Sequence, residues 1–167
     1  MPLSLLRGIN VAGQKKVPMV ELKKLYEDLG LKSVRTYIQS GNVIFEGDAK
    51  EEKIEKAIFK HFGFEVKVIN RSKEDLERVV KNNPFKGCDE GRIYVTFLAE
   101  SVEDSVIEKI QPFVAGAEKV VVAGREVYLY CPDGYGRTKL SNNLIEKKCG
   151  VAGTTRNWRT VGMLLEI

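Results

Sequence analysis

Three short segments of this chain concentrate side chains that donate hydrogen bonds and carry positive charge. They are LLRGINVAGQKKV (5–17), TYIQSGNVIF (36–45) and the stretch 135–160, which contains YGRTKLSNN and TTRNWRT. Arg, Lys, Asn, Ser, Thr and Gly dominate these segments, whereas Asp, Glu and His are nearly absent. Such side chains supply many donors but few proton acceptors. This composition suits recognition of anions or nucleic acids better than hydrolysis.

The loop GINVAGQKK (8–16) has two features of an anion site. Its glycines let backbone N–H groups approach a ligand, and it leads into a helix that Pro18 is expected to open, whose N-terminus favours anions. The spacing matches neither a Walker A loop nor a dinucleotide fingerprint. The alternative is a long loop whose Asn and Gly residues only satisfy turn geometry.

The C-terminal stretch combines arginines with two expected helix starts, one near Ser141 and one near Asn157. Guanidinium groups beside helix N-termini can form a cradle for phosphate or carboxylate oxygens. The alternative is that Ser141 and Asn157 serve only as N-caps and that Arg137 pairs with Asp133. Trp158 could stack on a nucleobase there, although a sole Trp more often anchors a core or an interface.

We group the expected ligand-binding residues into two clusters. The first cluster is Arg7, Asn10, Lys15, Lys16, Gln39, Ser40 and Asn42, and the second is Tyr135, Arg137, Lys139, Ser141, Asn142, Arg156, Asn157, Trp158 and Arg159. No catalytic residue, metal ligand or cofactor is predicted. The lone His61 lies far in sequence from both clusters, and no paired carboxylates occur within them.

Positive charge is concentrated in the same segments. The net charge of +4 is distributed unevenly, since residues 1–45 carry seven Lys/Arg against three Asp/Glu, and residues 133–160 carry six against two. The three cysteines form no CxxC pair, so neither a disulfide framework nor a zinc site is indicated. The opening apolar run is too short for a signal peptide, and no run is long enough to span a membrane. We therefore expect a soluble cytoplasmic protein without membrane contact, and the sequence does not set its oligomeric state.

Apolar runs and chain breakers predict the order βαββαβ, written twice, which is the ferredoxin-like arrangement. We expect an α+β protein of two pseudo-symmetric ferredoxin-like halves, 1–69 and 92–167, with mainly antiparallel sheets. The connector 70–91 should hold a short helix capped by Ser72. In the first half we expect strand 4–9, a helix from Pro18 to Leu29, strands 33–38 and 42–47, helix 54–62 and strand 64–69. In the second half we expect strand 92–99, helix 102–113, strands 118–123 and 126–131, helix 139–149, strand 151–155 and a terminal helix.

This topology determines which loops meet. Right-handed crossovers make the first two strands of each half parallel, so the segments that follow them lie at one end of the sheet. In the first half these segments are the 8–17 loop and the 39–42 turn. In the second half, the exits of the last two strands, 132–139 and 154–159, also share an end. Each cluster is thus expected to assemble in space.

The chain also resembles a known family. The motifs LLRGINVAGQKKVPMVELKKL, TYIQSGNVIF, TKLSNNLIEK and TTRNWRTV together resemble the bacterial family called domain of unknown function 1697, across essentially the whole chain. The resemblance implies two intertwined ferredoxin-like halves related by a pseudo-dyad, and it implies no particular activity. Residues 139–142 and 155–158 match the family motifs, while Thr138 and Ala12 replace its frequent Ser and Gly.

Three functional hypotheses remain open from the sequence. The first is a binding protein for a phosphate-bearing small molecule or nucleic acid. The second is an enzyme that polarises its substrate through Arg and Lys without a metal. The third is a structural module whose polar motifs lock the two halves together, which is consistent with buried Asn, Arg and Thr that satisfy one another.

Overall fold

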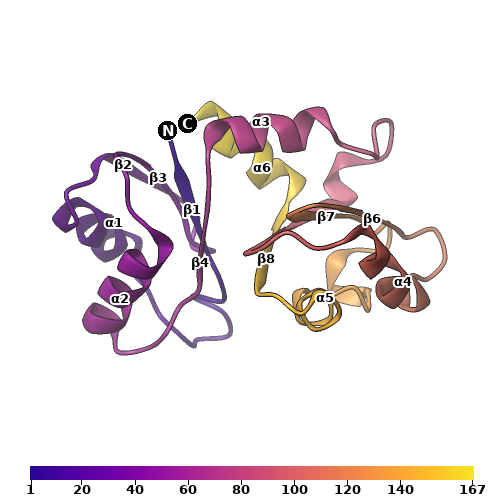
Figure 1. Ribbon diagram of the computed structural model, residues 1–167, viewed down its shortest axis with the longest axis horizontal. Coiled ribbons are helices and arrows are strands. Elements are labelled where there is room, and N and C mark those ends of the chain that lie inside the picture. Colours follow the sequence, from indigo (N-terminus) through magenta and orange to yellow (C-terminus); the bar gives the residue numbers. More distant parts are fainter. The chain divides into compact units, whose positions relative to one another are not determined.

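The computed structural model describes all residues, 1–167, and the chain divides into two compact units. The first unit is Met1–Leu76 together with Ile167, and the second is Glu77–Glu166. Helix α3 (Lys73–Lys81) contains the division between them (Figure 1).

The first unit is a βαββαβ fold. Its elements are β1 (Leu3–Leu6), α1 (Met19–Asp28), β2 (Lys32–Tyr37), β3 (Asn42–Glu46), α2 (Glu51–Phe62) and β4 (Val68–Arg71). The sheet has the order β2-β3-β1-β4, and all neighbouring strands are antiparallel. Helices α1 and α2 cover one face, where Leu22, Tyr26 and Ile58 join Phe45 in the core (Figure 1).

The second unit repeats this order. It contains η1 (Glu90–Arg92), β5 (Ile93–Leu98), η2 (Asp104–Val106), α4 (Ile107–Ile110), η3 (Gln111–Phe113), β6 (Lys119–Ala123), β7 (Glu126–Tyr130), η4 (Tyr135–Arg137), α5 (Asn142–Cys149), β8 (Gly153–Asn157) and α6 (Trp158–Glu166). The strand order β6-β7-β5-β8 is equivalent to that of the first sheet, again with antiparallel neighbours. The prediction of two ferredoxin-like α+β halves is confirmed.

Local sequence signals account for most element boundaries. Gly63 ends α2 in the left-handed conformation, as expected of a C-terminal glycine. Ser72 and Asp75 form a reciprocal capping box at α3, with Asp75 N–H donating to Ser72 Oγ at 3.0 Å and Ser72 N–H to Asp75 Oδ2 at 2.9 Å. Asn157 Oδ1 caps α6 by accepting from Thr160 N–H at 2.9 Å.

Several boundaries differ from the sequence expectation. The helix expected over 102–113 is divided into η2, α4 and η3, and Pro112 at the start of η3 cannot donate a backbone hydrogen bond. Helix α5 begins at Asn142 rather than 139, because Ser141 is its N-cap. Strand β4 starts at Val68 rather than 64, and β8 extends to Asn157 rather than ending at 155.

Candidate functional site

The loop between β1 and α1, residues 8–17, is held in an unusual backbone conformation. Asn10, Ala12 and Lys15 have positive φ angles of 54°, 51° and 47°, and Gly8 and Gly13 are also left-handed. A non-glycine residue in this region costs roughly 1–2 kcal/mol. Three such residues within six positions therefore require interactions that hold the loop in place.

The Asn10 side chain provides those interactions. Its Oδ1 accepts from Val17 N–H at 2.8 Å, and its Nδ2 donates to Val17 O at 3.0 Å and to Gln39 O at 2.8 Å. The Asn10 N–H also donates to Lys15 O at 3.0 Å. Asn10 thus closes the loop on itself and ties it to the turn that follows β2. We call residues 8–17 the Asn10 loop.

The turn between β2 and β3 fits closely beneath this loop. Gly41 has φ 91°, and a Cβ built on it would lie 2.7 Å from Ile9 Cδ1 and 2.8 Å from Leu6 Cβ. Buried Asn42 donates through Nδ2 to Tyr37 O at 2.8 Å and to Ser40 Oγ at 3.1 Å. Asn42 and Ser40, both expected to bind a ligand, therefore hold the turn together in the structure.

A groove of about 290 Å³ opens where the Asn10 loop meets α1. It is lined by Asn10, Gly13, Lys16, Val17, Pro18, Met19 and Gln39. The exposed side chains of Lys16 and Gln39 have no hydrogen-bond or ion-pair partner in the chain. Helix α1 begins here. Its N-cap is Pro18, whose ring carries no hydrogen-bond acceptor for the first helical N–H groups. The first twenty residues contain no Asp or Glu. Glu21, in the first turn of α1, places its Oε1 atom 3.4 Å from Nε2 of His61.

The other basic residues of the first cluster, Arg7 and Lys15, do not line this groove but bond to the segment 65–67 before β4. The Lys15 ammonium donates to Glu65 O at 2.8 Å, and Arg7, half-buried, donates its backbone N–H to Lys67 O at 3.0 Å. The expected meeting of the loop after β1 with the turn after β2 is therefore seen in the contact of Asn10 with Gln39 O. Of the first cluster, the groove brings together Asn10, Lys16 and Gln39.

The second cluster contains a closed hydrogen-bond network on the α4 and α5 side of its sheet. Thr155 Oγ1 donates to Asn142 Oδ1 at 2.9 Å and lies 2.7 Å from Thr96 Oγ1. The Tyr135 hydroxyl donates to Thr155 Oγ1 at 3.4 Å, and its ring stacks on Tyr94 with centroids 4.8 Å apart. Burial raises the pKa of Tyr135. These groups satisfy one another, as buried structural polar groups do.

Arg156 is buried in the second sheet. This residue, one of those predicted to bind a ligand, is only 6% exposed and lies on the opposite face of the sheet from Thr155, because successive strand residues alternate between faces. One guanidinium nitrogen donates to Thr154 Oγ1 at 2.7 Å and to Thr155 O at 3.0 Å. Burial lowers its pKa to about 10, which still leaves it charged at neutral pH.

Three more residues of the second cluster also have structural roles. Trp158 is buried rather than presented for stacking. Ser141 Oγ accepts from Leu144 N–H at 3.2 Å, and Asn157 caps α6, so both are the N-caps considered above. The exposed side chains of Arg137, Lys139 and Arg159 make no such contact, and Arg137 does not pair with Asp133.

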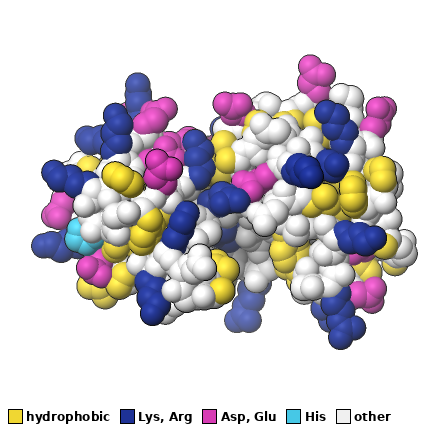
Figure 2. All heavy atoms as spheres, turned by 90° about the horizontal axis from the view of Figure 1, so that it is seen from below, with side chains coloured by type: hydrophobic (Ala, Val, Ile, Leu, Met, Phe, Trp, Pro, Cys, Tyr) yellow, Lys and Arg dark blue, Asp and Glu magenta, His cyan; other side chains and the backbone are white.

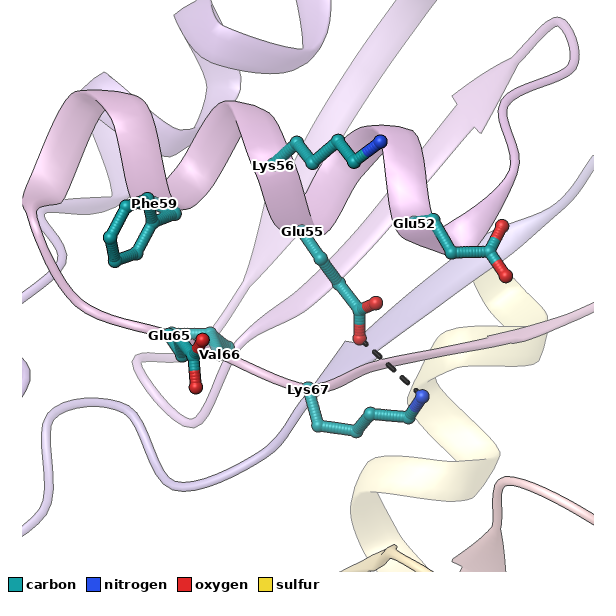
Figure 3. A pocket seen from close by; sticks show the side chains of 7 residues that line it. All are labelled: Glu52, Glu55, Lys56, Phe59, Glu65, Val66 and Lys67. Atoms are coloured by element: carbon teal, nitrogen blue, oxygen red, sulfur yellow. Dashed lines mark ion pairs between the residues drawn. The ribbon is translucent and has the colours of Figure 1, made fainter.

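A larger groove was not predicted from the sequence. It measures about 600 Å³ and lies between α2 and residues 65–67, with Glu52, Glu55, Lys56, Phe59, Glu65, Val66 and Lys67 around it (Figure 3). Glu55 pairs with Lys67 at 3.6 Å and accepts from Val68 N–H at 2.9 Å. The sequence contained one signal for this groove, because Phe59 falls outside the apolar stripe of α2 that contains Ile54 and Ile58. In the structure Phe59 is 53% exposed. No group of His, Cys, Asp and Glu in the chain is arranged to hold a metal ion.

The fold and its loops define a class of protein: an α+β chain built from two ferredoxin-like units with a loop groove in the first. The chain belongs to the family described as Protein of unknown function (DUF1697), whose model matches residues 2–128. It is also similar to a solved structure described as conserved bacterial protein SP0830 from Streptococcus pneumoniae, at 28% identity and a TM-score of 0.73. That similarity covers 98% of this chain and 97% of the other. No curated protein matches the chain significantly, and none of its helices has the length and apolar character needed to cross a bilayer.

Proposed function

We propose that the first unit binds the phosphate group of a small molecule or nucleic acid in the groove beside the Asn10 loop. The observation that carries this proposal is that the unpaired Lys16 and Gln39 border a groove of about 290 Å³ at the start of α1. A lysine ammonium supplies a positive point charge, and an amide can donate to a phosphate oxygen. The Asn10 loop, which carries Lys16, is already held in place by its hydrogen bonds. Binding therefore requires little reorganisation of the loop, which favours affinity.

The groove size favours a compact ligand. Sites for drug-sized molecules typically span about 300–1,000 Å³, so this groove lies at the lower limit of that range. A phosphate with its attached sugar suits such a volume better than an extended dinucleotide. On the face shown in Figure 2, Lys and Arg side chains are interspersed with acidic and hydrophobic ones instead of forming one continuous basic track. We therefore favour a nucleotide or a single phosphate of a strand over a long nucleic-acid footprint.

The same groove disfavours the enzyme hypothesis. Its lining contains no Ser, Thr, Cys, His, Asp or Glu, so Lys16 is its one side chain able to exchange a proton. Much of the second cluster instead has partners within its own unit, where the Thr155 network and Arg156 are internally satisfied. The proposal accordingly rests on the first unit.

Binding should be measured by calorimetry with inorganic phosphate and AMP, and by fluorescence anisotropy with a short oligo(dT), all at low salt. We expect Lys16→Ala to weaken binding of each bound ligand about tenfold, as the loss of one charge-assisted contact of about 1.4 kcal/mol implies. Lys24→Ala is the matched control, because Lys24 is an exposed lysine on α1, the helix that follows the loop of Lys16, and lies outside the groove. Equal effects of the two substitutions, or no binding by the wild type, would contradict the proposal.

Salt dependence separates the two ligand sources. For a single strand, log affinity falls with log salt by about 0.7 for each phosphate contacted. Lys16→Ala should therefore reduce the oligo(dT) slope by about 0.7 if a strand is the ligand. Binding of AMP or phosphate without binding of oligo(dT) would assign the groove to a small molecule.

A further inference from the structure

Strand β6 forms one edge of the second sheet, and its neighbour in that sheet is β7. All five residues pair in a continuous register, from Lys119 opposite Tyr130 to Ala123 opposite Glu126. The two-residue turn Gly124-Arg125 joins the strands. The opposite side of β6 is an unpaired strand edge, so the direction of its backbone groups determines what it can bind.

The hydrogen bonds around β7 reveal those directions. Leu98 N–H donates to Arg125 O at 2.7 Å and Cys131 N–H donates to Arg92 O at 2.9 Å, so the alternate residues Val127 and Leu129 are bonded to β5. The residues of β6 opposite these two are Val122 and Val120. Their N–H and C=O groups must therefore point away from β7, and neither N–H has a backbone acceptor outside the sheet.

The centre of this edge lacks the features that usually prevent strand addition, which are charges, proline and bulges, and the one charged residue of β6, Lys119, stands at its end. The β2 edge of the first sheet has such features: its register shifts between Lys32 and Arg35, and Ser33 between them has φ 51°. The centre of β6, by contrast, is three consecutive valines, 120–122, which are half-buried and in regular register. Residues of the preceding crossover, including Val106 and Phe113, pack onto the core beneath Val120 and Val122 rather than pairing with their backbone.

We propose that β6 pairs antiparallel with β6 of a second copy of this chain, with Val121 on the two-fold axis. In this register Val120 of one copy faces Val122 of the other, so the outward N–H and C=O groups of both residues meet each other. A shift by one residue would pair outward groups with inward ones. The strand is thus complementary to itself in this centred register, as a two-fold interface requires.

The charges agree with the same register. Lys119 of one copy would face Ala123 of the other, and Ala123 is itself opposite Glu126 in its own hairpin. Directly opposed residues share a face of the sheet, so the Lys119 ammonium could extend over the small Ala123 toward the Glu126 carboxylate. Within one copy Lys119 has no ion pair, and its ammonium lies 5.8 Å from the centre of the Tyr130 ring.

Cysteine crosslinking tests the register directly. Val121 of the two copies would form a non-hydrogen-bonded pair, whose Cα atoms lie about 4.5 Å apart and within reach of a disulfide. Under mild oxidation Val121→Cys should give a covalent dimer at least tenfold faster than Val120→Cys or Val122→Cys, which are not opposite themselves. The wild-type protein, oxidised in the same way, is the control for disulfides formed by the native cysteines Cys88, Cys131 and Cys149. Equal crosslinking at the three positions would overturn the proposal.

Sedimentation equilibrium tests the association itself. Wild type should show a concentration-dependent dimer. Val122→Pro should abolish it with an unchanged circular dichroism spectrum, because proline is tolerated where the strand N–H points outward. Val121→Lys, which places two like charges opposite each other on the axis, should also abolish the dimer. A monomeric wild type at millimolar concentration, or a dimer that persists in both variants, would refute pairing through β6.

Discussion

The Asn10 amide nitrogen lies 2.8 Å from the carbonyl oxygen of Gln39 and donates a hydrogen bond to it across 29 residues of sequence. This bond joins the loop after β1 to the turn after β2, the two segments that the topology brings to one end of the sheet. The same amide group also bonds both backbone atoms of Val17. Asn10 is thus the residue that fixes the walls of the proposed phosphate site.

Replacement of Asn10 should show how strongly this side chain holds the loop. Asn10→Ala removes all of its side-chain bonds and leaves a non-glycine residue at φ 54°, so we expect a loss of about 2–4 kcal/mol. Asn10→Gly removes the same bonds but relieves the backbone, and should lose about 1 kcal/mol less. Urea denaturation of both variants gives the comparison. A wild-type stability for Asn10→Ala would mean that the loop is held by other contacts.

Gly41→Ala should be one of the most damaging single-methyl additions in the chain. The new Cβ would lie 2.7 Å from Ile9 Cδ1 at a backbone φ of 91°, so overpacking and left-handed strain add to about 3 kcal/mol or more. Gly8→Ala is the control, since it has φ 69° but no atom within 4 Å of the added methyl, and should lose only about 1–2 kcal/mol. Similar melting temperatures for the two variants would argue against the close contact of loop and turn.

Arg156 and Arg137 should respond differently to truncation. Arg156→Ala leaves buried acceptors on Thr154 and Thr155 without their donor, and should destabilise by about 1–3 kcal/mol or more. Melting should fall by about 2–4 °C per kcal/mol in a chain of this size. Arg137 is exposed without a side-chain partner, so Arg137→Ala should leave the melting temperature nearly unchanged. The reverse order in thermal melts would contradict the roles assigned here.

Stability should fall at alkaline pH because several buried groups, Cys131 and Tyr128 among them, resist ionisation. Burial raises the pKa of Cys131 to about 11 and that of Tyr128 to about 12, above their ordinary values of 9.0 and 10.0. The folded state therefore binds protons more tightly than the unfolded state, and this stabilisation is complete below pH 9 and lost between pH 9 and 12. Cys131→Val should flatten the part of the profile between pH 9 and 11. An unchanged profile in Cys131→Val would exclude the thiol as a source.

The sequence predicted which loops meet, because this follows from topology, and which residues cap helices, because this follows from residue type. The contact of Asn10 with Gln39 O follows from right-handed crossovers, and the caps Ser72, Ser141 and Asn157 follow from residue type. It could not predict the burial of Arg156, because a polar strand residue gives no sign of which face another element covers. The groove beside Phe59 was also missed, since it depends on how residues 65–67 pass α2. The three left-handed residues of the Asn10 loop depend on bonds formed only in the fold.

The most direct test of the phosphate site is a ¹⁵N-HSQC titration of the wild-type protein with inorganic phosphate and AMP at low salt. We predict that the backbone amides of residues 13–20 and the side-chain amide of Gln39 shift together and saturate with one dissociation constant. Lys16→Ala should weaken that constant, whereas Lys24→Ala should leave it unchanged. Saturable shifts confined to residues 134–143 around α5, or no saturable shift at millimolar ligand, would contradict this prediction.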